Sequence, residues 1–132
     1  MADLLVSKNL MTIKSHKSDY TALFCKNGIE HLANNLPDNN FHIIIDEKVA
    51  NLYKNELKPI LNHSSVLLIK AIESHKSLES MPGHVSHLVS KQIRRDDVLI
   101  AIGGGIIQDI TCFLAATLLR GLDWYFYPTT LL

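Results

Sequence analysis

The fold is decided by the stretch VLIAIGGGIIQDITCFLAATLLRGLDWYFYPTTLL, residues 98–132. Residues 98–102 form an apolar, β-branched run with the length of a buried strand, and three glycines then interrupt it. The apolar side chains that follow recur at helical spacing, and Gly121 stands where a left-handed helix end is expected. Residues 124–127 predict a second buried strand, which Pro128 ends. A strand, a glycine turn, a helix and a strand form a βαβ unit, which favours a parallel sheet.

The helix after the glycines is apolar around most of its surface. One face is expected to carry Ile106, Ile110, Phe113, Leu114, Thr117 and Leu118. Cys112 and Ala116 make the rest of the surface apolar too, so the helix is expected to be largely buried. Its first amides carry partial positive charge and can hold a phosphate, and the glycines allow a ligand close to the main chain. The dinucleotide fingerprint G-x-G-x-x-G is met only in part, because Gln108 occupies the place of the third glycine.

The rest of the chain predicts strands that alternate with helices. We expect strands at residues 10–13, 20–25, 41–45 and 65–69, and helices at 29–36, at 49–61 and from 77 or 82 to 93. The first two strands form a hairpin, the next two are buried, and Pro59 kinks or ends the second helix. The helix residues expected to face inward are Val49, Leu52, Tyr53, Leu57, Ile60, Leu61, Val85, Leu88, Val89 and Ile93. This order predicts one α/β domain over residues 1–132, with a Rossmann-like, mostly parallel sheet, helices on both faces and an N-terminal β-hairpin.

Composition sets limits on the kind of protein. Hydrophobic residues make up 47% of the chain, and thirteen basic residues balance thirteen acidic ones, so nothing indicates nucleic-acid binding. We expect a cytoplasmic protein with no membrane span, because no signal peptide and no run of about 18 apolar residues is present. Cys25 and Cys112 are expected to be buried free thiols. His84 and His87 are expected on a solvated helix face, since no third metal ligand lies near them.

Polar residues and glycines gather at the predicted carboxyl ends of the strands. They are Asp46, Glu73 with Lys76, the glycines at 103–105, and Thr129 with Thr130. Ligands of parallel sheets bind outside these ends, at the point where the strand order reverses. A carboxylate accepts ribose hydroxyls, glycine amides hold a pyrophosphate, a lysine adds positive charge, and threonine hydroxyls bond polar groups. Together the residues predict a nucleotide site.

Each of these residues also has a structural interpretation. Asp46 could cap the next helix, and Asp109 could lie in the first turn of its helix for the sake of the helix dipole. Glu73 and Lys76 could be a solvated pair, and the threonines could form a turn. The convergence of all of them on one edge favours the nucleotide site.

The late motif resembles the N-terminal domain of 3-dehydroquinate synthase and its sugar-phosphate cyclase relatives. The pattern is E-x-x-K, then R-D-D-V-L-I-A-I-G-G-G-x-x-x-D-x-x-x-F-x-A-A-x-x-x-R-G, then P-T-T-L-L. Here it is carried by Glu73, Lys76, residues 95–105, Asp109, Phe113, Ala115, Ala116, Arg120, Gly121 and residues 128–132. The segment Ile45 to Val49 resembles the family's strand end with its aspartate. The resemblance covers residues 41–132 well and the first forty loosely.

The resemblance implies an NAD-dependent lyase, a homodimer that needs a divalent metal, zinc or cobalt. The family oxidises one hydroxyl of a phosphorylated sugar acid, eliminates phosphate, returns the hydride and closes a carbocycle by an intramolecular aldol reaction. By position, Asp46, Glu73 and Lys76 would contact the adenosine part of NAD. Residues 105–109 would cover the pyrophosphate and nicotinamide side, and Thr129 and Thr130 would lie near the nicotinamide. The cofactor-binding residues implied are Asp46, Glu73, Lys76, Gly104, Gly105, Ile106, Asp109, Thr129, Thr130 and Leu132.

Departures from the family pattern leave other interpretations open. Gln108 and Cys112 replace two usual glycines, which suggests a divergent cyclase rather than the main shikimate-pathway enzyme. The family's catalytic and metal-binding residues follow P-T-T-L-L, and none falls within this chain. We therefore expect a cofactor-binding portion, cut from a longer protein or a truncated gene product, that is inactive alone. The alternatives are a non-catalytic nucleotide-binding or dimerisation module, and an iron-dependent alcohol dehydrogenase-like fragment, although that group has a serine at the place of Ile106.

Overall fold

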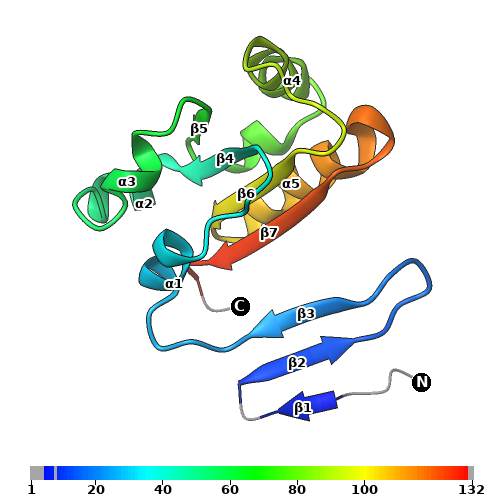
Figure 1. Cartoon of the computed structure of the whole chain (residues 1–132). Helices are drawn as coiled ribbons and strands as arrows, with labels where there is room; N and C mark the ends of the chain where they lie inside the picture. Colours follow the sequence, from blue (N-terminus) through cyan, green and yellow to red (C-terminus); the bar gives the residue numbers. More distant parts are fainter. Residues whose placement is uncertain (1–4, 8, 131–132) are drawn as a thin grey trace.

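The computed structural model describes residues 5–7 and 9–130 and contains two separate sheets (Figure 1). The strands are β1 (Leu5–Ser7), β2 (Leu10–Ile13), β3 (Tyr20–Leu23), β4 (Phe41–Asp46), β5 (Val66–Ile69), β6 (Val98–Gly103) and β7 (Asp123–Pro128). The helices are α1 (Gly28–Asn34), α2 (Glu47–Leu52), α3 (Lys58–Leu61), α4 (Met81–Ser90) and α5 (Gly105–Thr117), with 3₁₀ turns η1 (Glu73–Lys76) and η2 (Leu118–Arg120). A parallel sheet has the order β5-β4-β6-β7, and an antiparallel sheet has the order β1-β2-β3.

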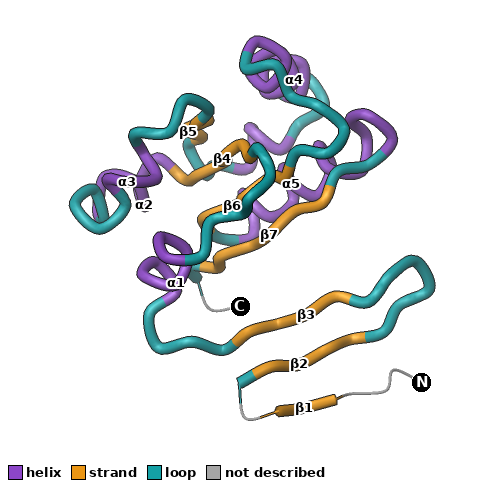
Figure 2. The backbone as a smooth tube through the Cα atoms, viewed as in Figure 1, coloured by secondary structure: helices purple, strands orange, loops and turns teal. Residues whose placement is uncertain are grey.

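The two central strands of the parallel sheet, β4 and β6, are buried on both faces. Their continuous apolar runs send alternate side chains into two cores. Ile44, Leu99 and Ala101 pack with α4 and α5 on one face. Ile43 and Ile45 pack with α1, α2 and α3 on the other. Figure 2 shows the helices on the two sides of this sheet. The predicted α/β fold with helices on both faces is confirmed.

The order of the strands reverses between β4 and β6. The chain runs from β4 to β5 on one side and then crosses back to β6 and β7 on the other. The strands end in register, with Asp46 opposite Ile69 and Gly103 opposite Pro128. The carboxyl ends of β4 and β6 are therefore neighbours at the reversal point, which is where a parallel sheet offers a crevice for a ligand.

The outer strands and helix faces are more exposed than the sequence predicts. Leu68 on β5 is 54% exposed and Tyr125 on β7 is 49% exposed, because both strands are edges of the four-stranded sheet. The prediction of a largely buried α5 is wrong, since Cys112, Phe113 and Thr117 are exposed. The buried side chains of α5 are Ile107, Ile110, Thr111, Leu114 and Ala115. Only one side of this helix packs on the sheet, so its outer face remains apolar without being covered.

The segment after β4 forms two short helices, not the single helix expected. Helix α2 ends at Leu52, and Pro59 lies in the first turn of α3, where proline is well tolerated. Leu52 and Tyr53 are exposed because they flank this break. On α4, Leu88 is fully buried but Val89 points outward and is 60% exposed.

Cys25 and Cys112 are free thiols, as predicted, but both are exposed and not buried. Cys25 lies in the loop after β3, where few side chains surround it. Cys112 lies on the outer face of α5. The apolar neighbours of a cysteine in the sequence do not decide which side of a helix it occupies.

Two helices end in left-handed residues other than glycine. At the end of α4, Gln92 has φ 59°, and the amides of Gln92 and Ile93 bond the carbonyls of Val89 and Leu88. This is a Schellman cap with glutamine where glycine is usual. After α5 the left-handed residues are Leu119 and Arg120. Gly121 has a φ of 109°, so the positive φ that the sequence predicts at this glycine is present.

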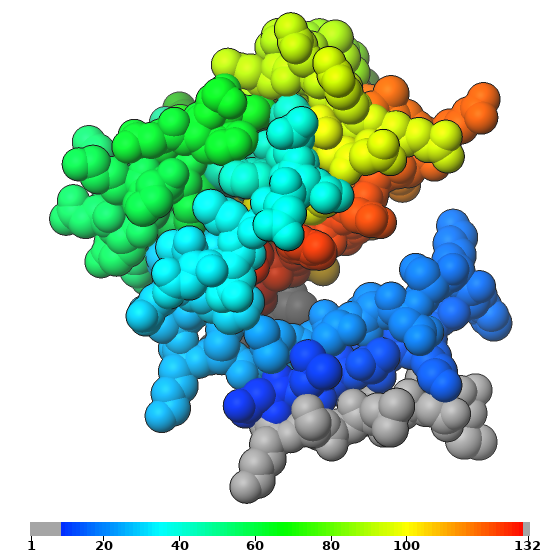
Figure 3. Space-filling view, viewed as in Figure 1, coloured from blue at the N-terminus to red at the C-terminus, as the bar shows by residue number. Residues whose placement is uncertain are grey.

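The N-terminal sheet lies apart from the parallel sheet, beside the β7 edge (Figure 3). The predicted hairpin of β2 and β3 is confirmed, with Leu10 opposite Leu23 and Ile13 opposite Tyr20. The sheet also contains β1, which the sequence did not predict. No side chain of residues 9–24 is buried, so backbone pairing and not a core holds this sheet together.

Candidate functional site

Three predicted site residues meet at the carboxyl edge of the parallel sheet. The Lys76 ammonium lies 3.2 Å from Glu73 Oε2 within η1, and 3.0 Å from Asp109 Oδ2 on α5. Its hydrogen bond with Asp109, and then that with Glu73, raise the pKa of Lys76, so it is protonated at neutral pH. Lys76 thus forms an ion pair with Asp109 on α5 as well as with Glu73. The interpretation of Glu73 and Lys76 as a solvated pair describes only one of these two contacts. Asp109 lies beyond the first turn of α5, so the helix dipole does not account for it.

The glycine turn after β6 is packed tightly on one side and open on the other. A Cβ on Gly103 would lie 2.6 Å from Ile107 Cγ1 and 3.3 Å from Asp46 Cβ. A Cβ on Gly104 would lie 2.9 Å from Thr130 Oγ1. A Cβ on Gly105 would meet nothing within 4 Å. The first two glycines therefore permit close packing, and the third faces free space.

The end of β7 is attached to this turn. The Thr129 amide donates to the Gly103 carbonyl at 2.9 Å, and the Thr130 side chain lies against Gly104. Both threonines are exposed. The turn that they form is thus structural, and it also places two hydroxyl groups beside the start of α5.

Helix α5 begins without a side-chain cap. Gly104 is its N-cap, and no acidic residue stands in its first turn. The amides at the start of a helix have no partner within it. The amides of Gly105, Ile106 and Ile107 therefore remain available to an anion. Thirteen residues of aligned peptide dipoles add a favourable field for negative charge.

Asp46 lies at the end of β4, beside the glycine turn. Its Oδ1 accepts a hydrogen bond from the Lys48 amide at 2.9 Å, so the interpretation as a helix cap is correct. Within the described residues its Oδ2 makes no hydrogen bond. One carboxylate oxygen thus caps α2 and the other remains free to accept. Leu132, the last of the predicted site residues, lies outside the described residues.

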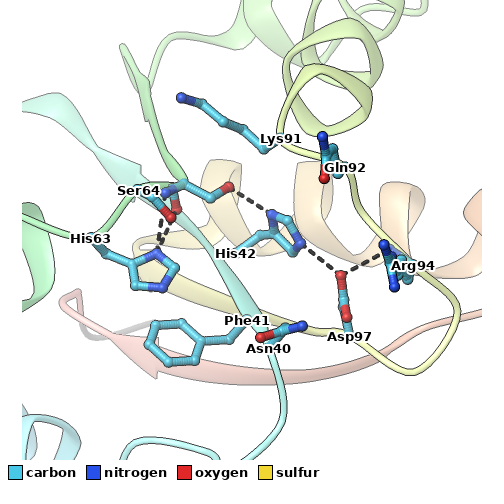
Figure 4. A pocket seen from close by; sticks show the side chains of 10 residues that line it. Asn40, Phe41, His42, His63, Ser64, Lys91, Gln92, Arg94 and Asp97 are labelled. Atoms are coloured by element: carbon cyan, nitrogen blue, oxygen red, sulfur yellow. Dashed lines mark hydrogen bonds and ion pairs between the residues drawn. The ribbon is translucent and has the colours of Figure 1, made fainter.

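The sequence did not predict a buried polar network at the opposite, amino-terminal edge of the sheet. His42 Nδ1 lies 2.6 Å from Ser65 Oγ, and His42 Nε2 lies 2.9 Å from Asp97 Oδ2 (Figure 4). Asp97 Oδ2 also accepts from the Arg94 amide at 2.8 Å. The signal was present in the sequence, as a histidine inside the apolar run FHIII and a serine and an aspartate directly before strands. Ser65 is only 3% exposed, so this Ser-His-Asp set ties strand ends together and presents no nucleophile to solvent.

His84 and His87 on α4 do not lie on a solvated face. Both are partly buried, and the Nε2 atom of each is enclosed without a hydrogen-bond partner in the described structure. Loss of hydration lowers the pKa of both, with Lys91 adding to the effect at His87. Residues 5–7 and 9–130 contain no group of three or more histidine, cysteine or acidic side chains placed to hold a metal. None of the helices in this part has the length and apolar character needed to cross a membrane.

Comparison with known proteins assigns the family. A sequence model of the 3-dehydroquinate synthase N-terminal region matches residues 66–132, half of the chain. The chain belongs to the 3-dehydroquinate synthase family. The matched segment contains η1, the glycine turn, Thr129 and Thr130 of the carboxyl-edge site, whereas Asp46 lies before it.

Several 3-dehydroquinate synthases are similar to this family member over most of its length. That of Dichelobacter nodosus is 45% identical over 92 residues, covering 68% of this chain and 25% of the relative. That of Staphylococcus saprophyticus is 38% identical over 124 residues, covering 92% of this chain and 34% of the relative. The chain thus spans between a quarter and about a third of the length of these two relatives.

The fold is also that of a solved inosose synthase. The crystal structure of 2-deoxy-scyllo-inosose synthase superposes with a TM-score of 0.72 at 16% identity, covering 92% of this chain and 36% of that one. The same enzyme complexed with carbaglucose-6-phosphate, NAD+ and Co2+ gives a TM-score of 0.70. At this identity the likeness establishes the shared fold.

Proposed function

We propose that this chain forms the NAD-binding part of a 3-dehydroquinate-synthase-like enzyme. The observation that carries the proposal is the meeting of Lys76, Glu73 and Asp109 beside the uncapped start of α5. The free amides at the start of α5 suit the pyrophosphate of a dinucleotide, and the Lys76 ammonium is held at the same edge by its two carboxylate partners. The NAD complex of the solved neighbour supports this choice of cofactor.

The proposed roles follow from the chemistry of each group. The amides of Gly105 and Ile106 hold the pyrophosphate, because the space over Gly105 is open to a ligand. The free oxygen of Asp46 accepts ribose hydroxyls, and Lys76 supplies positive charge. Gly104, Thr129 and Thr130 form the wall on the other side of the turn, and Glu73, Asp109 and Leu132 complete the proposed set. NAD, when bound, supplies reversible hydride transfer.

The reaction of the whole protein is proposed from its relatives. The 3-dehydroquinate synthases reach 45% identity, whereas the inosose synthase reaches 16%, which favours the former activity despite Gln108 and Cys112. The proposed reaction eliminates phosphate from a phosphorylated sugar acid and closes a ring. The described residues contain no cluster of side chains that could hold the zinc or cobalt of the family.

Calorimetric titration of the 132-residue chain with NAD tests the proposal. We expect saturable binding, weakened about tenfold by Lys76→Met, which is the effect of losing one charge-assisted hydrogen bond. Lys58→Met is the matched control, because Lys58 is an exposed lysine on α3, remote from the carboxyl edge. Absence of heat at millimolar NAD, or equal weakening by both variants, would contradict the assignment of the site.

A role in assembly is the second candidate function, and the proposed homodimer belongs to it. The described side chains of the N-terminal sheet include exposed apolar groups, with Tyr20 at 56%, Leu23 at 47% and the adjacent Phe24 at 62%. Exposed clusters of this kind often mark protein interfaces. Sedimentation should show a dimer that Leu23→Asp dissociates, and a clean monomer with intact NAD affinity counts against this role.

The free thiols Cys25 and Cys112 support the proposed location in the reducing cytoplasm.

A further inference from the structure

A pocket lies at the amino-terminal edge of the parallel sheet, opposite the proposed cofactor site. It has a volume of about 320 Å³ and is lined by the start of β4 and the residue before it, by residues that precede β5 and β6, and by the segment after α4. Figure 4 shows Lys91, Gln92 and Arg94 on one side, His63 and Ser64 on the other, and His42 between them. Its size is in the range of small-molecule sites, roughly 300–1,000 Å³.

The pocket is rich in positive charge and in hydrogen-bond donors. Its one acidic lining residue, Asp97, is 6% exposed and already accepts from His42 and from the Arg94 amide. In the described part of the chain neither Lys91 nor Arg94 forms an ion pair. The positive charges of Lys91 and Arg94 are therefore not neutralised by other residues of the pocket. A bound anion would form the charge-assisted hydrogen bonds that they lack.

The imidazole of His63 is held in place by two contacts. Its Nδ1 lies 3.2 Å from the Ser65 amide nitrogen and 3.4 Å from the Ser65 carbonyl oxygen, and within the described residues its Nε2 makes no hydrogen bond. The ring stacks on Phe41 with centroids 4.2 Å apart and planes inclined by 20°. These two contacts hold the ring, and with it the Nε2 atom, in place before any ligand arrives.

The helix cap at Gln92 contributes a side chain to the pocket. Gln92 has φ 59°, a conformation that costs a non-glycine residue roughly 1–2 kcal/mol, and glycine would cap α4 without that cost. Its side chain lines the pocket beside Lys91 and Arg94. The strain at this position is consistent with a role for the glutamine side chain in the pocket.

We propose that this pocket binds a phosphate group, either free phosphate or the phosphate of a small phosphomonoester. In this proposal Arg94 and Lys91 supply the charge, His63 donates from Nε2, and Gln92 with Asn40 supplies amide donors. The buried network of His42 and Asp97 forms the floor and ties the three strands that surround the site. The site is separate from the cofactor edge and does not depend on the proposed function.

The test is titration of the 132-residue chain with inorganic phosphate and, separately, with glucose 6-phosphate, followed by amide chemical shifts in NMR. We expect saturable shifts at His63, Gln92 and Arg94. Arg94→Gln and Lys91→Gln should each weaken binding about tenfold, with Lys14→Gln, an exposed lysine between β2 and β3, as the matched control. Tighter binding of glucose 6-phosphate identifies a phosphomonoester site, and equal binding identifies a site for free phosphate.

Phosphate could instead bind at the glycine turn on the other edge of the sheet. The residues whose amide chemical shifts change distinguish the two sites. Shifts confined to residues 103–107 overturn the proposal, as do equal affinities in the Arg94→Gln and Lys14→Gln variants. Absence of saturation up to 20 mM phosphate, roughly the weakest binding that such a site would show, overturns it as well. Circular dichroism of each variant confirms that the fold is intact.

Discussion

Replacing Gly103 with alanine is expected to destabilise the domain by about 3 kcal/mol, the upper part of the range for overpacking a core. The added methyl group would lie 2.6 Å from Ile107 Cγ1 and 2.9 Å from Ile107 Cβ, with Asp46 Cβ at 3.3 Å on its other side. Ile107 is fully buried between the sheet and α5, so it cannot turn away without opening the core. The three consecutive glycines are therefore expected to respond very differently to the same substitution.

The matched controls are the next two glycines. At Gly104 the added methyl meets the Thr130 side chain, which is exposed and free to rotate, so a loss of at most about 1 kcal/mol is expected. At Gly105 it meets nothing within 4 Å, and alanine in this helical position should stabilise by up to about 1 kcal/mol.

Urea unfolding at 25 °C of the three single variants measures these differences. A double-mutant cycle with Ile107→Ala checks the cause, because removing Ile107 Cγ1 should reduce the cost of Gly103→Ala by at least about 1 kcal/mol. A Gly103→Ala variant as stable as Gly105→Ala would refute the reasoning. Complete unfolding of Gly103→Ala beside a folded Gly105→Ala is the expected result in its strongest form.

Three further perturbations test other parts of the structure. Gln92→Gly should raise the unfolding free energy by about 0.5–1 kcal/mol, because glycine adopts the left-handed cap without strain, and thermal melting measures it. His42→Ala should lower it by about 3 kcal/mol, because Asp97 is left buried without its imidazole partner, and urea unfolding measures this loss. Burial lowers the pKa of His84 and His87 in the folded state. As the pH falls below about 6.5, these histidines take up protons in the unfolded chain before they do so in the folded chain, so the unfolding free energy should decrease.

Each of these predictions has a defined contrary outcome. Gln92→Gly at or below the stability of the parent chain would show that the cap is not strained. A loss after His42→Ala below that of the exposed control His16→Ala would show that the buried network adds nothing. Replacing both His84 and His87 by leucine should flatten the pH dependence between about 6.5 and 5, and an unchanged slope would assign it to other groups.

The candidate site was predictable because its residues sit at the ends of strands that are recognisable from the sequence. The apolar runs of β4 and β6 identify central parallel strands, and their carboxyl ends must share one edge. That places Asp46 beside the glycine turn without any structure. The pairing of Lys76 with Asp109 was not predictable, because it depends on how η1 turns toward α5 across 33 positions of chain.

The faces of the helices were harder to predict than their existence. An apolar sequence such as that of α5 does not identify which side of the helix packs on the sheet. In the structure Ile107 and Thr111 are buried against the sheet, whereas Phe113 and Thr117 are exposed. The same limit applies to Cys112 and to Val89, whose exposure depends on one side of each helix being left uncovered.

By itself the sequence determined the alternation of strands and helices, the parallel sheet, the glycine turn and the membership of the 3-dehydroquinate synthase family. These follow from local periodicity and from short motifs, which neighbouring residues carry together. Only the tertiary structure decided that Gly103 is pressed against Ile107 while Gly105 faces free space, and that Asp97, His42 and Ser65 meet at the opposite edge. Such contacts join residues far apart in the chain, and their geometry depends on the packing of the whole sheet and its helices.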